Sequence, residues 1–176
     1  MIGRGRDSME HSEPVLSAND LLEWSDVTAQ RWRELVNESP AVLSIPCDVR
    51  GSSTVADLLL HIAAAELRYA EQLSGFAPTD YKHLSSASPE AIFGTHDRAI
   101  ALYRTLLLQP SYPWNELFTV TTRSAGELIA TRRDVFLHGL LHGIRHYAQL
   151  ATLARHHGYP PQWQMDFLFL HAHSRM

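Results

Sequence analysis

Four long stretches in which apolar residues recur at helical spacing constrain the fold of this chain more than any other feature. Ser17 and Ser88 precede the first and third stretches as N-caps, where a side-chain oxygen accepts a hydrogen bond from the first helical turn. Gly75 and Gly158 follow the second and fourth stretches, as is common where helices end. The pattern predicts helices over residues 17–37, 54–74, 89–109 and 126–157. Such helices form an all-α four-helix bundle most economically.

The segments outside these helices carry weaker signals. Residues 1–15 are polar and aperiodic, which predicts a disordered tail, and Met9 is an alternative start to Met1. Residues 16–176 then form a single domain. The segment 111–127 mixes Pro and Trp with a β-branched run, which predicts a loop with a short strand or hairpin. The apolar residues 162–176 predict a short C-terminal helix or turn.

Charge and cysteine content exclude several function classes. A formal net charge of −4 opposes nucleic-acid binding, which needs a basic face to neutralise phosphates. No stretch reaches the ~18 apolar residues of a membrane span. Cys47 is the only cysteine, so an internal disulfide and a cysteine-based zinc site are both excluded. We therefore expect a cytoplasmic protein that binds neither nucleic acid nor membranes.

The fourth helix carries an unusual polar stripe. The chain has 11 histidines, and three of them, His138, His142 and His146, recur every four residues, so that their rings leave one side of the helix together with Arg145 and Gln149. One interpretation is a solvated stripe on a mostly buried helix. However, such stripes usually consist of Glu, Lys and Arg, with opposite charges four residues apart. The other interpretation is half of a metal site.

A histidine in the second helix favours the metal interpretation. His61 lies amid apolar residues, and Ala64 and Ala65 one turn away would leave space beside its ring. Two imidazoles at i and i+4, with a third from a facing helix, can bind one divalent ion and leave positions open for water or substrate. Asp57, four residues before His61, would either orient that ring or be an exposed first-turn acid. Glu66 points away from the ring and is expected to be a salt-bridge partner within the bundle.

The three histidines of the fourth helix cannot all bind one ion. His138 and His146 lie two turns apart, roughly 12 Å along the helix axis. The spacing therefore allows a site that uses either His138 with His142 or His142 with His146, and His142 belongs to both.

At these residues the chain resembles the DinB/YfiT-like superfamily of metalloenzymes. Members have a histidine in the second helix and a His-x-x-x-His-Arg-Gly-Gln pattern late in the fourth. The sequence "HGIRHYAQ" (142–149) resembles this pattern with His142, His146 and Gln149 in place, while Tyr147 and Ala148 replace the usual Arg-Gly. "DLLLHIAAAELRYAEQL" resembles the stretch around the other histidine, His61. The resemblance covers about residues 17–170 and implies an up-down-down-up four-helix bundle.

The resemblance also implies a function. His61, His142 and His146 are expected to hold a divalent ion, zinc or nickel, and His138, Gln149, Asp57 and Arg145 to surround it or line a pocket. Relatives include thiol S-transferases, a mycothiol-dependent isomerase and hydrolases, so the ion is expected to activate a water or a low-molecular-weight thiol for a small-molecule substrate. No catalytic side chain is assigned beyond that nucleophile. The alternative is a non-catalytic metal-binding or stress-response module, and a homodimer is one assembly open to either.

Overall fold

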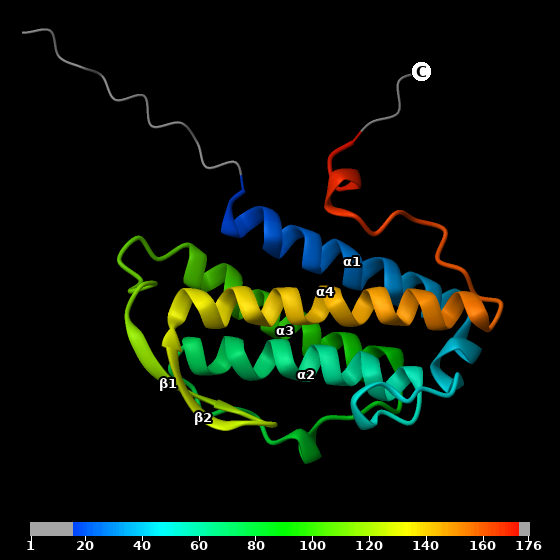
Figure 1. The fold of residues 1–176 in the computed structure, drawn as a ribbon, viewed down its shortest axis with the longest axis horizontal. Helices are drawn as coiled ribbons and strands as arrows, with labels where there is room; N and C mark the ends of the chain where they lie inside the picture. Colours follow the sequence, from blue (N-terminus) through cyan, green and yellow to red (C-terminus); the bar gives the residue numbers. More distant parts are fainter. Residues whose placement is uncertain (1–15, 173–176) are drawn as a thin grey trace, which may run out of the picture.

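The computed structural model describes residues 16–172, apart from the side chain of Arg50, and consists of four long helices and one β-hairpin (Figure 1). The helices are α1 (Ala18–Glu38), α2 (Val55–Leu73), α3 (Pro89–Leu107) and α4 (Arg132–His156). The hairpin strands are β1 (Leu117–Thr122) and β2 (Gly126–Thr131). Short 3₁₀ turns are η1 (Pro40–Ser44), η2 (Val49–Gly51), η3 (Tyr81–His83) and η4 (Phe167–Phe169). The predicted four-helix bundle is confirmed, and the two-stranded sheet is an addition to it.

The helices follow the up-down-down-up order. In Figure 1, α1 and α4 run in one direction, and α2 and α3 run in the other. The ion pairs Arg33–Asp97 and Asp26–Arg104 fix the antiparallel register of α1 against α3. Helix α2 packs against both α3 and α4, so the second and fourth predicted helices are neighbours, as a shared metal site requires.

The helices begin where their N-cap side chains lie. Ser17 accepts a hydrogen bond from the backbone N–H of Asp20, whose carboxylate accepts one from the backbone N–H of Ser17, a capping box. Thr131 caps α4 by accepting a hydrogen bond from the N–H of Asp134. Each cap satisfies a first-turn N–H that has no partner inside the helix.

The prediction that the fourth helix begins at 126 is wrong. Residues 126–131 form β2, which pairs antiparallel with β1, and α4 starts only at Arg132. The physical reason is twofold: pairing with the β-branched run of β1 satisfies the backbone of this segment, and the extended backbone of Thr131 lets its side chain cap α4. Gly126 has φ +69°, a conformation that glycine adopts without strain, where the chain turns from one strand to the other.

The C-terminal segment packs against α1. The indole N–H of Trp24 donates to the backbone carbonyl of Met165 at 2.9 Å, and Trp163 contacts the fully buried Trp32 edge to face. The turn η4 follows, so the expected C-terminal helix or turn is present as a 3₁₀ turn of three residues. The predicted N-terminal tail and the choice between Met1 and Met9 lie outside the described residues. Among residues 16–172, no helix combines the length and the apolar character that crossing a membrane requires.

Candidate metal centre

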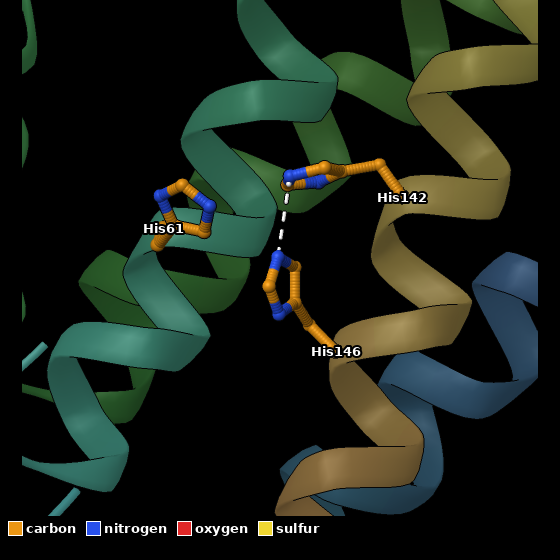
Figure 2. A group of neighbouring side chains, drawn as sticks. All are labelled: His61, His142 and His146. Carbon is orange, nitrogen blue, oxygen red and sulfur yellow. Dashed lines mark hydrogen bonds between the residues drawn. The ribbon is translucent and has the colours of Figure 1, made fainter. Parts of the chain in front are cut away.

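Three histidines from two neighbouring helices meet inside the bundle. His61 comes from α2, while His142 and His146 come from successive turns of α4, and all three rings point into one space (Figure 2). One ring nitrogen from each lies within 4.8 Å of the others, a spacing at which the three could hold a single metal ion. This group, here called the histidine cluster, is the set that the sequence pattern favoured.

Two glycines of α4 allow this helix to pack closely against its neighbours, Gly143 against the other histidine helix and Gly139 against α3. A Cβ atom at Gly143 would lie 2.9 Å from Oε1 of Glu66 and 3.3 Å from Cγ2 of Ile62, both on α2. A Cβ at Gly139 would overlap the hydroxyl of Tyr103 on α3. Gly139 and Gly143 recur at the same spacing of four as the histidines and each follows one of them in the sequence. Small residues at that spacing allow close helix contact.

Gln149 fixes the ring of His146. The amide oxygen of Gln149 lies 2.6 Å from Nδ1 of His146. Because an amide oxygen only accepts hydrogen bonds, Nδ1 carries the proton and Nε2 keeps its lone pair. That Nε2 lies 3.2 Å from Nε2 of His142, inside the cluster. A hydrogen bond to the far nitrogen is how proteins usually orient a metal-binding imidazole.

The cluster keeps His142 neutral. Burial and, to a smaller extent, the neighbouring His146, His61, Arg145 and His138 together lower the pKa of His142 to about 3. Its Nδ1 is buried and forms no hydrogen bond with any residue in the described part of the chain. A neutral imidazole has the free electron pair that binding to a metal requires.

A pocket of about 510 Å³ opens onto the cluster, with His61 and His142 in its wall. Ala64 and Ala65 also line it, so the small side chains beside His61 do leave space, as the sequence suggested. The pocket extends along α2 and α4 toward the β-hairpin.

The tip of the hairpin forms one rim of the pocket. Arg123 and Ser124, in the turn after β1, line it together with Tyr81 of η3. The guanidinium of Arg123 lies 4.2 Å from the ring centre of Tyr81, a cation–π contact. Gln72 of α2 holds the strand itself, because its amide accepts from the N–H of Thr121 at 2.7 Å and donates to the carbonyl of Thr121 at 3.1 Å.

The remaining predicted residues lie at different distances from the cluster. His138 is outside the group of three but lines the pocket, with its ring 5.3 Å from that of Tyr69 and 5.6 Å from that of His142. Arg145 also lines the pocket, and its Nη2 lies 3.5 Å from Nε2 of His146. Of the two pairs that the spacing allowed, the structure thus brings His142 and His146 together with His61.

Asp57 lies at the start of α2. Its carboxylate accepts hydrogen bonds from the N–H of Ser53 at 3.3 Å and from the hydroxyl of Ser86 at 3.1 Å. These contacts stabilise the first turn of the helix and the segment that leads into α3. Of the two roles predicted for Asp57, its position fits the first-turn acid.

The bundle also contains a second group of charged residues that the sequence pattern did not indicate. Glu66 is fully buried, and its Oε2 lies 2.6 Å from Nδ1 of His96, which is also fully buried. Asp26 of α1 lies 3.4 Å from the other ring nitrogen of His96 and forms an ion pair with Arg104. We call Asp26, Glu66 and His96 the buried ion cluster. The expected salt-bridge role of Glu66 is confirmed, but a lone histidine in the third helix gave no signal of its own.

Ion pairing dominates the protonation of this second group. Burial by itself lowers the pKa of His96, but the charge of Glu66 and the hydrogen bonds to Asp26 and Glu66 outweigh that effect and raise it to about 9. The hydrogen bond from His96 is the main cause that lowers the pKa of Asp26 to about 2. His96 is therefore a cation at neutral pH, and the group is an internal salt bridge.

Comparison with known proteins agrees with the histidine pattern. The model of the DinB family matches residues 12–175, a span that includes all four helices and the histidine cluster. No curated protein matches the chain. The resemblance inferred from His61 and the "HGIRHYAQ" segment is thereby confirmed.

Proposed function

This chain belongs to the DinB family, and on that premise we propose that it is a divalent-metal-dependent enzyme. His61, His142 and His146 hold the ion, zinc or nickel, and the nucleophile is a water or a low-molecular-weight thiol, so the reaction is a hydrolysis or a thiol transfer. One observation carries the proposal: a pocket of about 510 Å³ opens onto the histidine cluster.

The donor set suits such an ion. Three imidazole nitrogens within 4.8 Å of one another match a site with three protein ligands and open positions, the usual arrangement of catalytic zinc. Imidazole suits both zinc and nickel. Gln149 holds the ring of His146 by its Nδ1, which directs Nε2 into the cluster.

A divalent cation in this position supplies one thing, a lower pKa for the water or thiol that reaches it. The residues of the chain supply the rest. Ala64 and Ala65 keep the space beside His61 open for the nucleophile and its substrate. The guanidinium of Arg145, 3.5 Å from His146, adds a positive charge that stabilises negative charge developing on the nucleophile.

The pocket also favours an enzyme over a module that only stores metal. Its volume lies within the ~300–1,000 Å³ range of small-molecule sites, whereas a purely structural ion is usually enclosed by its ligands. The expected partner is thus a small-molecule substrate. The homodimer and the cytoplasmic location stay predictions.

Metal analysis of the untagged protein tests the site. We expect about one zinc or nickel ion per chain in the wild type and almost none in His61→Ala, His142→Ala or His146→Ala, because two imidazoles bind far more weakly than three. His157→Ala, an exposed histidine just after α4, is the matched control and keeps the metal. Retention of the metal by all three cluster variants would mean that the cluster is not a metal site.

A turnover assay then separates the enzyme from the module. The metal-loaded protein is incubated with small thiols plus an electrophile, and separately with esters and amides in water. Thiol-dependent or water-dependent turnover that is lost in His142→Ala supports the proposal and identifies the nucleophile. A protein that binds its ion stoichiometrically but turns over no substrate in either set would be the non-catalytic module.

A further inference from the structure

We propose that the pocket beside the histidine cluster binds a substrate with an oxyanion, a carboxylate or a phosphate, held by Arg68, Arg123 and Arg145. These arginines come from α2, the hairpin turn and α4, and all three line the same pocket. The inference rests on the proposed function only in assigning the reactive end of the substrate to the histidine cluster.

The first observation is the charge of the pocket. None of the residues that line it within 16–172 is acidic, and three are arginines. The formal net charge of the chain is −4, so this local excess of positive charge runs against the average composition. A divalent ion held by neutral imidazoles would add to the excess, and an anionic ligand would compensate for it.

The second observation is that these arginines have no carboxylate partner. Outside the pocket, Arg33, Arg98 and Arg104 are ion-paired with Asp97, Glu71 and Asp26. In the part of the chain that the structure describes, Arg31 and Arg155 bond only to a backbone carbonyl and a hydroxyl, so what sets the pocket apart is that three arginines without a carboxylate partner share one site. Within the described residues, Arg68, Arg123 and Arg145 form no such pair. Guanidinium groups recognise carboxylate and phosphate through two parallel hydrogen bonds. Three of them at one concave site are therefore available to a ligand.

The third observation is where the arginines lie along the pocket. Arg68 follows His61 by seven residues on α2, about 10 Å along the axis and on nearly the same face. Arg123 lies at the hairpin rim, stacked on Tyr81. Arg145 lies beside the cluster. The geometry fits an elongated ligand that carries negative charge along its length: Arg145 attracts the charge at the histidine end, and Arg68 and Arg123 bind the anionic group that reaches toward the hairpin.

Calorimetric titration with suberate, a linear dicarboxylate, tests this site without any turnover. Wild type, Arg68→Gln and Arg145→Gln are compared in the zinc-loaded and the metal-free forms, and zinc content is measured in each. Arg155→Gln is the control, because Arg155 is exposed on the same helix α4 but does not line the pocket. Inorganic phosphate and the neutral diamide of suberate are titrated alongside.

We expect Arg68→Gln and Arg145→Gln to weaken anion binding about tenfold each, as loss of a charge-assisted hydrogen bond does. The control should match wild type, and the diamide should not bind. Arginine-dependent binding of suberate identifies a carboxylate site, and arginine-dependent binding of phosphate alone identifies a phosphate site.

The anion site would be overturned if wild type bound neither anion at millimolar concentration, or if both pocket variants bound like the control. The proposed function has a separate outcome. A wild type that holds zinc but binds no anion loses only the anion site. A wild type that binds anions through its arginines but holds no metal loses only the metal-dependent function.

Discussion

The bundle contains two groups of inward-facing histidines whose environments are opposite. In the histidine cluster, His142 has other imidazoles and Arg145 as neighbours, and burial together with these groups lowers its pKa to about 3. In the buried ion cluster, His96 lies between two carboxylates, and its pKa rises to about 9. The first histidine is neutral and able to bind a cation, while the second is itself the cation.

The two groups are close together, which makes the difference instructive. Glu66 follows His61 by five residues on α2, so its side chain points to α1 and α3 while His61 faces the pocket. Its carboxylate also lies against Gly143, in the turn of α4 between His142 and His146. Burial alone disfavours a charged imidazole at both places. What separates a candidate metal ligand from an internal salt bridge is the presence of a carboxylate within hydrogen-bond distance.

The largest expected effect is the loss of Glu66. Glu66→Ala leaves His96 buried without its partner at 2.6 Å, and breaking a buried pair in this way costs ~3–5 kcal/mol of the free energy of unfolding. His142→Ala in metal-free protein should cost only ~1 kcal/mol, since it removes no ion pair. Urea unfolding of both variants measures the contrast. Equal losses of unfolding free energy in the two variants would show that the buried ion cluster is not held together by ion pairing more than the histidine cluster is.

The next effect is a loss of stability at alkaline pH. The folded-state pKa of His96, about 9, lies above its ordinary value of 6.5. The protonated His96 therefore adds roughly 3 kcal/mol to the free energy of unfolding. This contribution is complete below pH 6.5 and is lost as pH rises through 9. Asp26 acts in the other direction: its contribution is present above pH 3.8 and is lost as pH falls toward 2.

Thermal unfolding between pH 6 and 10 measures the alkaline arm. His96→Gln, which keeps a hydrogen-bonding side chain but does not titrate, should flatten the profile in this range. If His96→Gln lost stability between pH 6 and 10 as steeply as wild type does, the alkaline loss of stability would come from another titrating group.

A smaller effect is expected from widening the gap between α2 and α4. Gly143→Ala places a methyl group 2.9 Å from Glu66 and 3.3 Å from Ile62, and such overpacking costs ~1–3 kcal/mol. Because His142 and His146 flank this residue, metal affinity should fall as well. Gly94→Ala is the control: nothing lies within 4 Å of its added Cβ, so this variant should be neutral or slightly more stable. Urea unfolding and zinc titration of the two variants show whether the packing at Gly143 connects the buried ion cluster with the histidine cluster.

The smallest effect is expected from His138. Its ring is exposed and lies outside the group of three, so His138→Ala should keep the metal and change stability by less than about 0.5 kcal/mol. Metal content measured beside His146→Ala decides the register. If His138→Ala lost the ion and His146→Ala kept it, the site would lie one turn earlier on α4.

Much of the fold could be predicted, because helix periodicity and caps are local. The predicted bounds 17–37, 54–74 and 89–109 lie within about two residues of α1, α2 and α3. The prediction failed at residues 126–131, where "GELIAT" forms β2 instead of the first turns of α4. The strand forms because residues 126–131 pair with residues 117–122. The periodicity of either segment alone does not indicate such pairing.

The histidine cluster could be predicted for a related reason. His142 and His146 share a helix face because of their spacing, and His61 stood out as a histidine beside small side chains in the second helix. The spacing also allowed His138 with His142, and the resemblance to a family favoured His142 with His146. The pairing of Glu66 with His96 carries no comparable spacing, because the two residues lie on different helices. The same holds for the arginines of the pocket, which come from three separate elements.

The sequence by itself determined the helices, their caps and the i, i+4 histidine pair, since each depends on residues within a few positions of one another. Only the tertiary structure decided which histidine becomes a cation and which stays neutral, because a pKa depends on the charges and burial around the ring. The packing of α2 against α3 brings His96 to Glu66, and the packing of α2 against α4 at Gly143 brings His61 to His142 and His146. Helix packing thus gave identical side chains opposite electrostatic environments.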